Sequence, residues 1–166
     1  MNAAAPEQAW VALGGNVGDV GTTFAEAVRA MDALPMTGVL RRSSVYRTPP
    51  WGDPGQPSFL NAAVELRTRL PPAALLAHLL DIERRFGRDR SAERRWGPRT
   101  LDLDLLMQGD RPVELPGLSL PHPRLHERAF VLVPLAEIAP DLVIPGRGRV
   151  ADLLAAVDAG GIEAIP

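Results

Sequence analysis

Apolar positions along the chain fall into two patterns, one typical of strands and one typical of helices. Four segments alternate apolar and polar residues or form short apolar runs, which predicts β-strands. These segments are 9–15, 39–48, 59–70 and 99–107. Proline and glycine are dense at 49–58, which we therefore expect to be a long loop.

Two other segments have the spacing and the boundary residues of α-helices. Within 16–34, apolar residues recur every three or four positions, and Thr22 or Thr23 is the expected N-cap. The segment 71–87 opens with prolines, continues with good helix formers and stops at a glycine. The predicted elements therefore follow the order β-α-β-β-α-β.

This order predicts an α+β protein with a ferredoxin-like sandwich, in which two helices cover one face of an antiparallel sheet. The remaining chain predicts C-terminal additions: extended pieces near 113–120, a helix over 127–140 interrupted by Pro134, and a short helix at 150–157. No repeat and no linker divides the sequence, so we expect residues 1–166 to form a single domain.

The composition narrows the classes of protein that fit. Of 166 residues, 46% are hydrophobic and 23% are charged, which is typical of a globular protein. A net charge of -2 gives no basic field for nucleic acid, and no apolar run reaches the roughly 20 residues of a membrane span. With no cysteine and no signal peptide, we expect a cytoplasmic protein, and the short chain favours a monomer.

All 18 basic residues are arginine, and the chain has no lysine. A P-loop lysine and a Schiff-base lysine are therefore excluded. Phosphate chemistry here would rest on arginine, histidine, backbone N–H groups and metal, and the planar guanidinium suits phosphate because it binds two oxygens at once. A GC-rich coding bias is the simpler explanation for most of this count.

Two aspartates, Asp102 and Asp104, interrupt a run of leucines in the last predicted strand. Because side chains alternate along a strand, Leu101, Leu103 and Leu105 should face the helix-covered core while both carboxylates face the other way. Neighbouring carboxylates repel each other, and Mg²⁺ would relieve that repulsion. An exposed pair of solvated aspartates, partnered by arginine, is the alternative.

An arginine-rich segment precedes this strand. Between residues 84 and 99 the chain has seven arginines, interrupted by two acidic residues. Such a run is usually a solvated helix end and loop. Because it leads directly into the carboxylate pair, it also fits a loop that closes over a metal-bound polyphosphate.

Several other residues suit a flat, hydrogen-bonding ligand. Phe59 and Asn61 are two apart on a predicted strand and should share a face with the aspartates. Trp51 and Trp96 lie beside prolines and could stack on a heterocycle, whereas packing in the core is the alternative for Phe59. His122 lies between prolines, where a surface or capping role competes with a phosphate contact.

Three blocks of the sequence resemble the 6-hydroxymethyl-7,8-dihydropterin pyrophosphokinase family. They are "YRTPPWGDPGQPSFLNAAVEL", "RWGPRTLDLDLL" and "LSLPHPRLHERAFVLVPLAEIAPDL", in the family's order, within about residues 10 to 146. The resemblance implies that ATP donates its β,γ-pyrophosphoryl group to the hydroxymethyl oxygen of the pterin in folate biosynthesis, with release of AMP. It also implies the ferredoxin-like fold already predicted.

The resemblance further implies roles for individual residues. Asp102 and Asp104 match the pair that holds two Mg²⁺ ions on the ATP phosphates, and the other implied catalytic residues are Arg88, Arg90 and Arg99. The implied ATP contacts are Glu83, Arg90, Arg99, His122 and Arg128. The implied pterin contacts are Phe59 and Phe130 against the ring, Asn61 at its edge, the backbone of Thr48, Pro49, Pro50 and Trp51, and Trp96 as a closing side chain.

The implied reaction is an in-line displacement at the β-phosphorus, and either Asp104 or the metal could accept the proton. Two other interpretations remain open at this stage. One is a ferredoxin-like nucleotide-binding module without turnover, and the other is a metal-dependent phosphohydrolase, for which the usual extra ligands are missing. The glycine-rich 14–19 does not have the dinucleotide-binding spacing, so we interpret it as a tight turn.

Overall fold

A mixed sheet-and-helix fold is seen in the computed structural model, which describes residues 5–49, 55, 57–87 and 100–166. The first part comprises β1 (Glu7–Gly15), α1 (Val20–Asp32), β2 (Thr37–Arg42), β3 (Tyr46–Thr48), β4 (Phe59–Thr68), α2 (Pro72–Arg85) and β5 (Asp102–Gln108). The second part comprises β6 (Val113–Leu115), β7 (Leu118–Leu120), η1 (Leu125–Glu127), α3 (Ala129–Ile138), β8 (Val143–Ile144), β9 (Gly148–Arg149), α4 (Val150–Ala155) and β10 (Glu163–Ala164).

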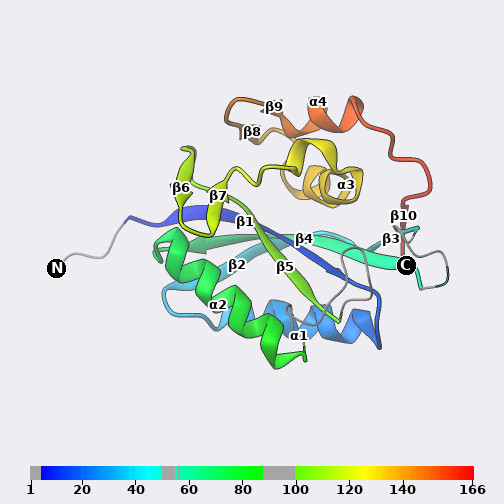
Figure 1. Ribbon diagram of the computed structural model, residues 1–166, viewed down its shortest axis with the longest axis horizontal. Helices are drawn as coiled ribbons and strands as arrows, with labels where there is room; N and C mark the ends of the chain where they lie inside the picture. Colours follow the sequence, from blue (N-terminus) through cyan, green and yellow to red (C-terminus); the bar gives the residue numbers. More distant parts are fainter. Residues whose placement is uncertain (1–4, 50–54, 56, 88–99) are drawn as a thin grey trace.

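The central sheet is antiparallel and has the strand order β10-β3-β4-β1-β5, with β2 pairing along another part of β4. Helices α1 and α2 cover one face, while α3, β8, β9 and α4 lie over the other (Figure 1). The predicted order β-α-β-β-α-β and the ferredoxin-like α+β class are confirmed.

The predicted strand at 39–48 is divided in two. Both β2 and β3 pair with β4, and the chain leaves the ladder between them at Ser43. The backbone N–H of Ser43 donates to the carbonyl of Ala63 at 2.8 Å, and its hydroxyl accepts the N–H of Ala63 at 2.8 Å. The Ser43 side chain therefore replaces one backbone hydrogen bond of the ladder. At this residue the strand that pairs with β4 changes from β2 to β3.

Both main helices bury one apolar stripe against the sheet. In α1 that stripe includes Phe24 and Met31, both fully buried. The N-cap of α1 is Asp19, so the prediction of Thr22 or Thr23 was wrong. The Asp19 carboxylate accepts the backbone N–H of Thr22 at 3.2 Å and its hydroxyl at 2.8 Å, which places both threonines in the first turn.

The leucines of the aspartate-containing strand face the helices, as predicted. Leu101, Leu103 and Leu105 are 0%, 1% and 3% exposed, and α2 packs along β5. The two aspartates between them are only half-buried. Alternation along the strand thus separates an apolar face from a carboxylate-bearing one.

Helix α3 lies across the opposite face of the sheet, over β4, β1 and β3. The predicted interruption at Pro134 was wrong, because α3 runs continuously from Ala129 to Ile138. Proline removes one backbone donor. Burial of Val131, Leu132 and Leu135 beneath the helix outweighs that loss.

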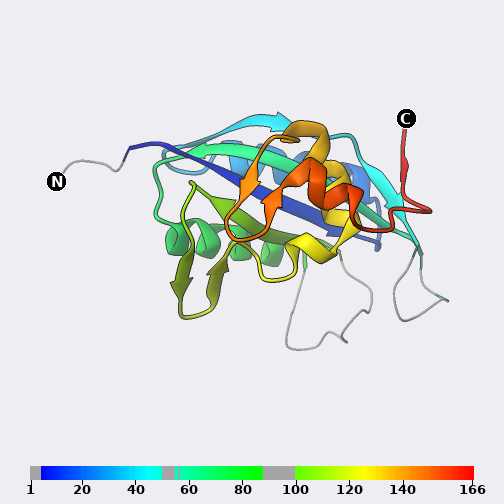
Figure 2. The same cartoon turned by 90° about the horizontal axis from the view of Figure 1, so that it is seen from above.

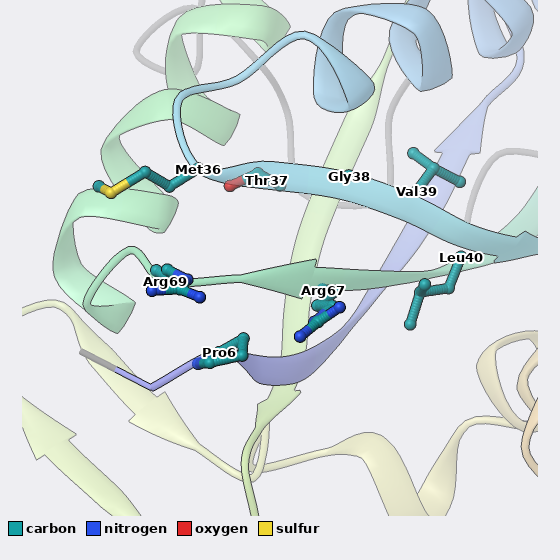
Figure 3. A pocket seen from close by; sticks show the side chains of 8 residues that line it. All are labelled: Pro6, Met36, Thr37, Gly38, Val39, Leu40, Arg67 and Arg69. Carbon is teal, nitrogen blue, oxygen red and sulfur yellow. The ribbon is translucent and has the colours of Figure 1, made fainter. Parts of the chain in front are cut away.

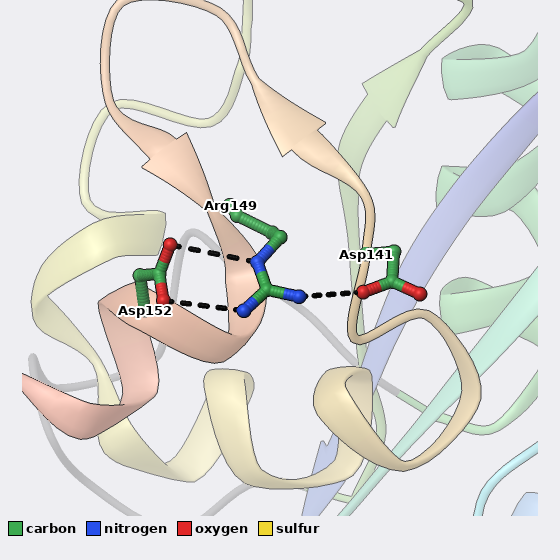
Figure 4. Close-up of polar contacts among 3 residues, drawn as sticks. All are labelled: Asp141, Arg149 and Asp152. Carbon is green, nitrogen blue, oxygen red and sulfur yellow. Dashed lines mark hydrogen bonds and ion pairs between the residues drawn. The ribbon is translucent and has the colours of Figure 1, made fainter.

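The C-terminal segment is held by ion pairs and then returns to the sheet. Arg149 contacts Asp141 at 2.7 Å and both carboxylate oxygens of Asp152 at 3.4 and 3.5 Å (Figure 4). Beyond α4, β10 pairs with β3, and the N–H of Ile165 donates to the carbonyl of Val45 at 2.8 Å (Figure 2). None of the described helices is long and apolar enough to cross a membrane.

A buried carboxylate connects the sheet to α3. Glu65 is 3% exposed, accepts the indole N–H of Trp10 at 2.9 Å and lies 3.9 Å from the guanidinium of Arg41. Arg41 also donates to the carbonyl of Ile138 at 3.1 Å, at the end of α3. This chain of contacts anchors the C-terminal end of α3 to β2 and β4.

We expect Glu65→Ala to lower the free energy of unfolding by about 1–3 kcal/mol, because it leaves a buried indole N–H without its acceptor. Urea denaturation of purified protein measures this difference. Glu65→Gln is the matched control, since its amide oxygen can still accept from Trp10. Equal stability of Glu65→Ala and the unchanged protein would contradict the prediction.

Candidate functional site

The two aspartates lie on β5, on the face of the sheet that α3 partly covers. Asp102 pairs with Gly14 and Asp104 pairs with Ala12 on the neighbouring β1. Residues two apart on one strand project to the same side, so both carboxylates lie together. Among the described residues, no group of three or more carboxylate, histidine or cysteine side chains could by itself hold a metal ion.

A row of three residues crosses the middle of the sheet. Gly14 of β1 pairs with Asn61 of β4 on one side and with Asp102 of β5 on the other. Strands are about 4.8 Å apart, so the Asn61 and Asp102 backbones are about 10 Å apart. Phe59 and Asn61 therefore share a face with the aspartates, as the alternation predicted.

Gly14 leaves the middle of this row without a side chain. A Cβ atom at this position would lie 3.3 Å from Oδ1 of Asn61 and 3.9 Å from Cβ of Asp102. The sequence interpretation, a tight turn at 14–19, missed this role. A glycine inside a strand pattern was the available signal, because it often marks the close approach of a ligand or another chain segment.

The side chain of Asn61 is fixed by its neighbours. It is buried, and its amide donates to the hydroxyl of Thr48 at 2.9 Å. Thr48 in turn lies 3.4 Å from the carbonyl oxygen of Phe59, to which it donates. These bonds orient Oδ1 of Asn61 over Gly14. They also bring together Thr48, Phe59 and Asn61. Pro49, directly after β3, is exposed.

His122 follows the β6–β7 hairpin and lies near the carboxylates. Its backbone N–H donates to the carbonyl of Leu106, and its Nδ1 accepts the N–H of Arg124 at 3.2 Å. Burial lowers the pKa of His122 to about 4; the charges of Arg128 and Arg124 act in the same direction and that of Asp102 opposes them. The imidazole is therefore neutral near pH 7 and carries its proton on Nε2.

Arg128 connects His122 to an aromatic ring. Its guanidinium carbon lies 5.7 Å from the centre of the Phe130 ring, which is within the range of a cation–π contact. Phe130 is half-buried in the first turn of α3. The arginine is thus close to both Phe130 and His122.

Glu83 is placed differently from the other predicted ATP contacts. It is 2% exposed near the end of α2, and its carboxylate accepts the backbone N–H of Leu103 at 2.7 Å. It therefore braces β5 between Asp102 and Asp104. Its contact with ATP remains a prediction.

A pocket of about 440 Å³ opens beside Asp104 and His122, between α2, β5 and the β6–β7 hairpin. Most of its lining is apolar, including Leu76, Leu80 and Leu118. A second pocket of about 580 Å³, at the opposite end of β4 from Asn61, contains Arg67 and Arg69 but no carboxylate (Figure 3). Of these two pockets, only the first is lined by one of the aspartates, Asp104.

Six of the residues predicted for the site lie outside the described residues. They are Pro50, Trp51, Arg88, Arg90, Trp96 and Arg99. Their implied roles stay predictions.

Glu137, near the end of α3, bonds to the strand that leads into Thr48. Its carboxylate accepts the hydroxyl of Tyr46 at 2.5 Å and the backbone N–H of Ser44 at 2.9 Å. Burial raises the pKa of Tyr46 to about 12, and the bond to Glu137 and its negative charge add to the shift. Partial burial raises the pKa of Glu137, but the bonds from Tyr46 and Ser44 outweigh it and leave the pKa lowered.

Comparisons with known proteins point to one family. Residues 10–140 match the family model of 7,8-dihydro-6-hydroxymethylpterin-pyrophosphokinase. The chain is 51% identical over 158 residues to the 2-amino-4-hydroxy-6-hydroxymethyldihydropteridine pyrophosphokinase of Methylorubrum extorquens, covering 95% of this chain and 98% of that protein. It is 42% identical over 160 residues to the protein of the same name in Pseudomonas aeruginosa, covering 96% and 98%.

The fold is also similar to that of larger solved proteins. A Plasmodium falciparum HPPK-DHPS with pteroate matches with a TM-score of 0.70 and 13% identity over 92% of this chain. Our chain spans 42% of that protein's length. At this identity the match concerns the fold alone.

The single tyrosine of the chain allows a direct test of the Tyr46–Glu137 bond. We expect tyrosinate absorbance of the folded protein to appear near pH 12, and in Glu137→Gln to move down toward the ordinary value of about 10. Because the folded-state pKa is raised, the stability that Tyr46 contributes is complete below pH 10 and is lost as the pH rises to about 12. Circular dichroism confirms folding at each pH, and titration near 10 in the folded protein would contradict the assignment.

Proposed function

The chain belongs to the 7,8-dihydro-6-hydroxymethylpterin-pyrophosphokinase family, and from this premise we propose how its residues carry out the reaction. The protein transfers the pyrophosphoryl group of ATP to hydroxymethyldihydropterin, a step of folate biosynthesis. It is an enzyme with ATP as co-substrate, so neither a binding module without turnover nor a phosphohydrolase describes it.

The observation that carries the proposed site is the row Asn61–Gly14–Asp102. We assign the Asn61 end to the pterin, because its fixed carboxamide can pair with the donors at the edge of a flat heterocycle. Phe59 and Phe130 would contact the two faces of the ring. The pterin would then extend over Gly14, where no side chain blocks it, and bring its hydroxymethyl group toward Asp102.

The Asp102 end fits a magnesium site. Asp102 and Asp104 are half-buried carboxylates on one face of a strand, and hard oxygen donors of this kind suit Mg²⁺. Two protein carboxylates leave most coordination positions to phosphate and water, as is usual for magnesium bound with a nucleotide. We propose that they hold two Mg²⁺ ions, which would offset phosphate charge and make the hydroxyl group easier to deprotonate.

The nucleotide fits the pocket beside Asp104 and His122. Its leucine side chains suit the flat faces of the base, and Asp104 in its lining is on the side where the phosphates would lie. Neutral His122 would donate from Nε2 to an oxygen of ATP, while Arg128 supplies a permanent positive charge. Arg88, Arg90 and Arg99 would stabilise the transferred group, and Trp51 and Trp96 would enclose the pterin.

In this arrangement the chain acts mainly by positioning. Asn61 and the two phenylalanines orient the pterin hydroxyl for in-line attack on the β-phosphorus, and the aspartates and arginines orient the phosphates. Burial around His122 and Arg128 strengthens their electrostatic contacts with the phosphates.

Other features of the protein stay predictions. We propose that residues 1–166 are one catalytic domain, because the C-terminal β10 completes the same sheet as β1. A monomeric state, a cytoplasmic location and the lack of a nucleic-acid partner are expected from the sequence only.

Purified protein supplied with ATP, Mg²⁺ and hydroxymethyldihydropterin should release AMP and pterin diphosphate in equal amounts. Asp102→Asn should reduce this rate by at least about a hundredfold, because it removes a charged group aimed at the reacting phosphates. Chromatography of the adenine nucleotides measures both.

Asp110→Asn is the control for the aspartate, since Asp110 follows the same strand but its side chain is 97% exposed. It should leave the rate unchanged. Near-normal AMP formation by Asp102→Asn would reject the metal assignment, and ADP in place of AMP would reject pyrophosphoryl transfer.

His122→Ala should raise the KM for ATP by about 2- to 10-fold, as expected for the loss of one neutral hydrogen bond. The KM for the pterin should change less than about twofold, because His122 is bonded to β5, and Asn61 on β4 is two strands from β5. His122→Gln, which keeps an N–H donor, should recover part of the loss. A pterin KM that rises as much as the ATP KM would contradict the assignment of His122 to the nucleotide.

A further inference from the structure

Glu137 joins two parts of the proposed pterin site that are far apart in the sequence. It lies in the last turn of α3, the helix whose first turn carries Phe130. Its carboxylate accepts from the N–H and the hydroxyl of Ser44 and from the hydroxyl of Tyr46, at 2.5 to 3.3 Å. All three donors belong to β3 or to the residues directly before it.

The bonded strand continues into the pterin contacts. Tyr46 pairs with Asn61, so both belong to the cross-strand row that includes Gly14. Two residues later, Thr48 accepts from the amide of Asn61. A displacement of β3 would therefore move Thr48 and change the orientation of Asn61.

Helix α3 connects Glu137 in its last turn to Phe130 in its first turn. Glu137 is seven positions after Phe130, which is about 10 Å along a helix. Within that length α3 is packed on β4 by buried apolar side chains and behaves as a rigid element. A bond at Glu137 consequently fixes the angle at which Phe130 approaches the site.

We propose that Glu137 is a positioning residue for the pterin, acting through Tyr46 and Ser44 to hold Phe130 in register with Thr48 and Asn61. This inference rests on the proposed placement of the pterin between Phe59 and Phe130. Glu137 does not contact the reacting atoms in this role. It sets the separation and angle of the side chains that bind the ring.

A purely structural role for Glu137 would predict that its loss weakens folding and ATP binding as much as pterin binding. The end of α3 is also anchored by Arg41, which donates to the carbonyl of Ile138 at 3.1 Å and contacts buried Glu65. Helix α3 therefore stays docked without Glu137, but it loses its direct bonds to β3. Pterin binding should suffer more than folding or ATP binding.

The test compares steady-state kinetics of Glu137→Ala, Glu137→Gln and Tyr46→Phe. Loss of charge-assisted hydrogen bonds should raise the pterin KM about tenfold in Glu137→Ala and about threefold in Tyr46→Phe. Glu137→Gln keeps an acceptor oxygen and should lie between Glu137→Ala and the unchanged protein. The KM for ATP should change less than about twofold in all three.

Asp152→Asn is the matched control, because it also neutralises an exposed carboxylate that holds a C-terminal element, here through Arg149. It should leave the pterin KM unchanged. A rise equal to that of Glu137→Ala would show general loosening of the C-terminal elements and would overturn the inference. If Glu137→Ala fails to fold, Tyr46→Phe decides the test.

Two further variants separate this inference from the proposed site. Asn61→Ala and Phe130→Ala should each raise the pterin KM. If neither does, the proposed pterin placement is wrong, and the role of Glu137 falls with it. If both do while Glu137→Ala and Tyr46→Phe match the unchanged protein, the site stands and the positioning role is rejected.

Discussion

The antiparallel register of β1 with its two neighbours is the constraint on which the site depends. It places Gly14 opposite both Asn61 and Asp102, so that one residue without a side chain separates the two ends of the site. A slip of one residue would turn Asp102 and Asp104 toward the helices and the leucines toward the site. Burial of those leucines opposes the slip, so the hydrophobic core also determines where the carboxylates point.

The same separation of faces governs the electrostatics. On the helix-covered side of β5 the leucines are buried, and the Glu83 carboxylate there accepts the backbone N–H of Leu103. The opposite face gathers carboxylates, a neutral histidine and an arginine that contacts an aromatic ring. Because Arg128 contacts Phe130 and also acts on His122, the pterin and nucleotide parts of the proposed site are linked by one guanidinium.

Local patterns were enough to predict much of this arrangement. Alternation around Asp102 predicted which side chains face the core. The proline and glycine at the ends of the segment 71–87 predicted α2. Local patterns could not predict that α3 continues through Pro134, because its stability comes from packing on strands about 70 residues away. Nor could they show that Gly14 forms the floor of the site, since its neighbours there belong to β4 and β5.

The two parts of the site therefore depend on the fold in different ways. On the nucleotide side, the polar groups of Asp104 and His122 come from β5 and from the segment directly after the β6–β7 hairpin, so they are close in sequence. On the pterin side, the bonds of Glu137 to Ser44 and Tyr46 span 93 and 91 residues of sequence. Such long-range contacts form only when α3 docks on the sheet, so the pterin side becomes ordered with the complete tertiary structure. Its geometry is accordingly sensitive to residues that the substrate does not touch.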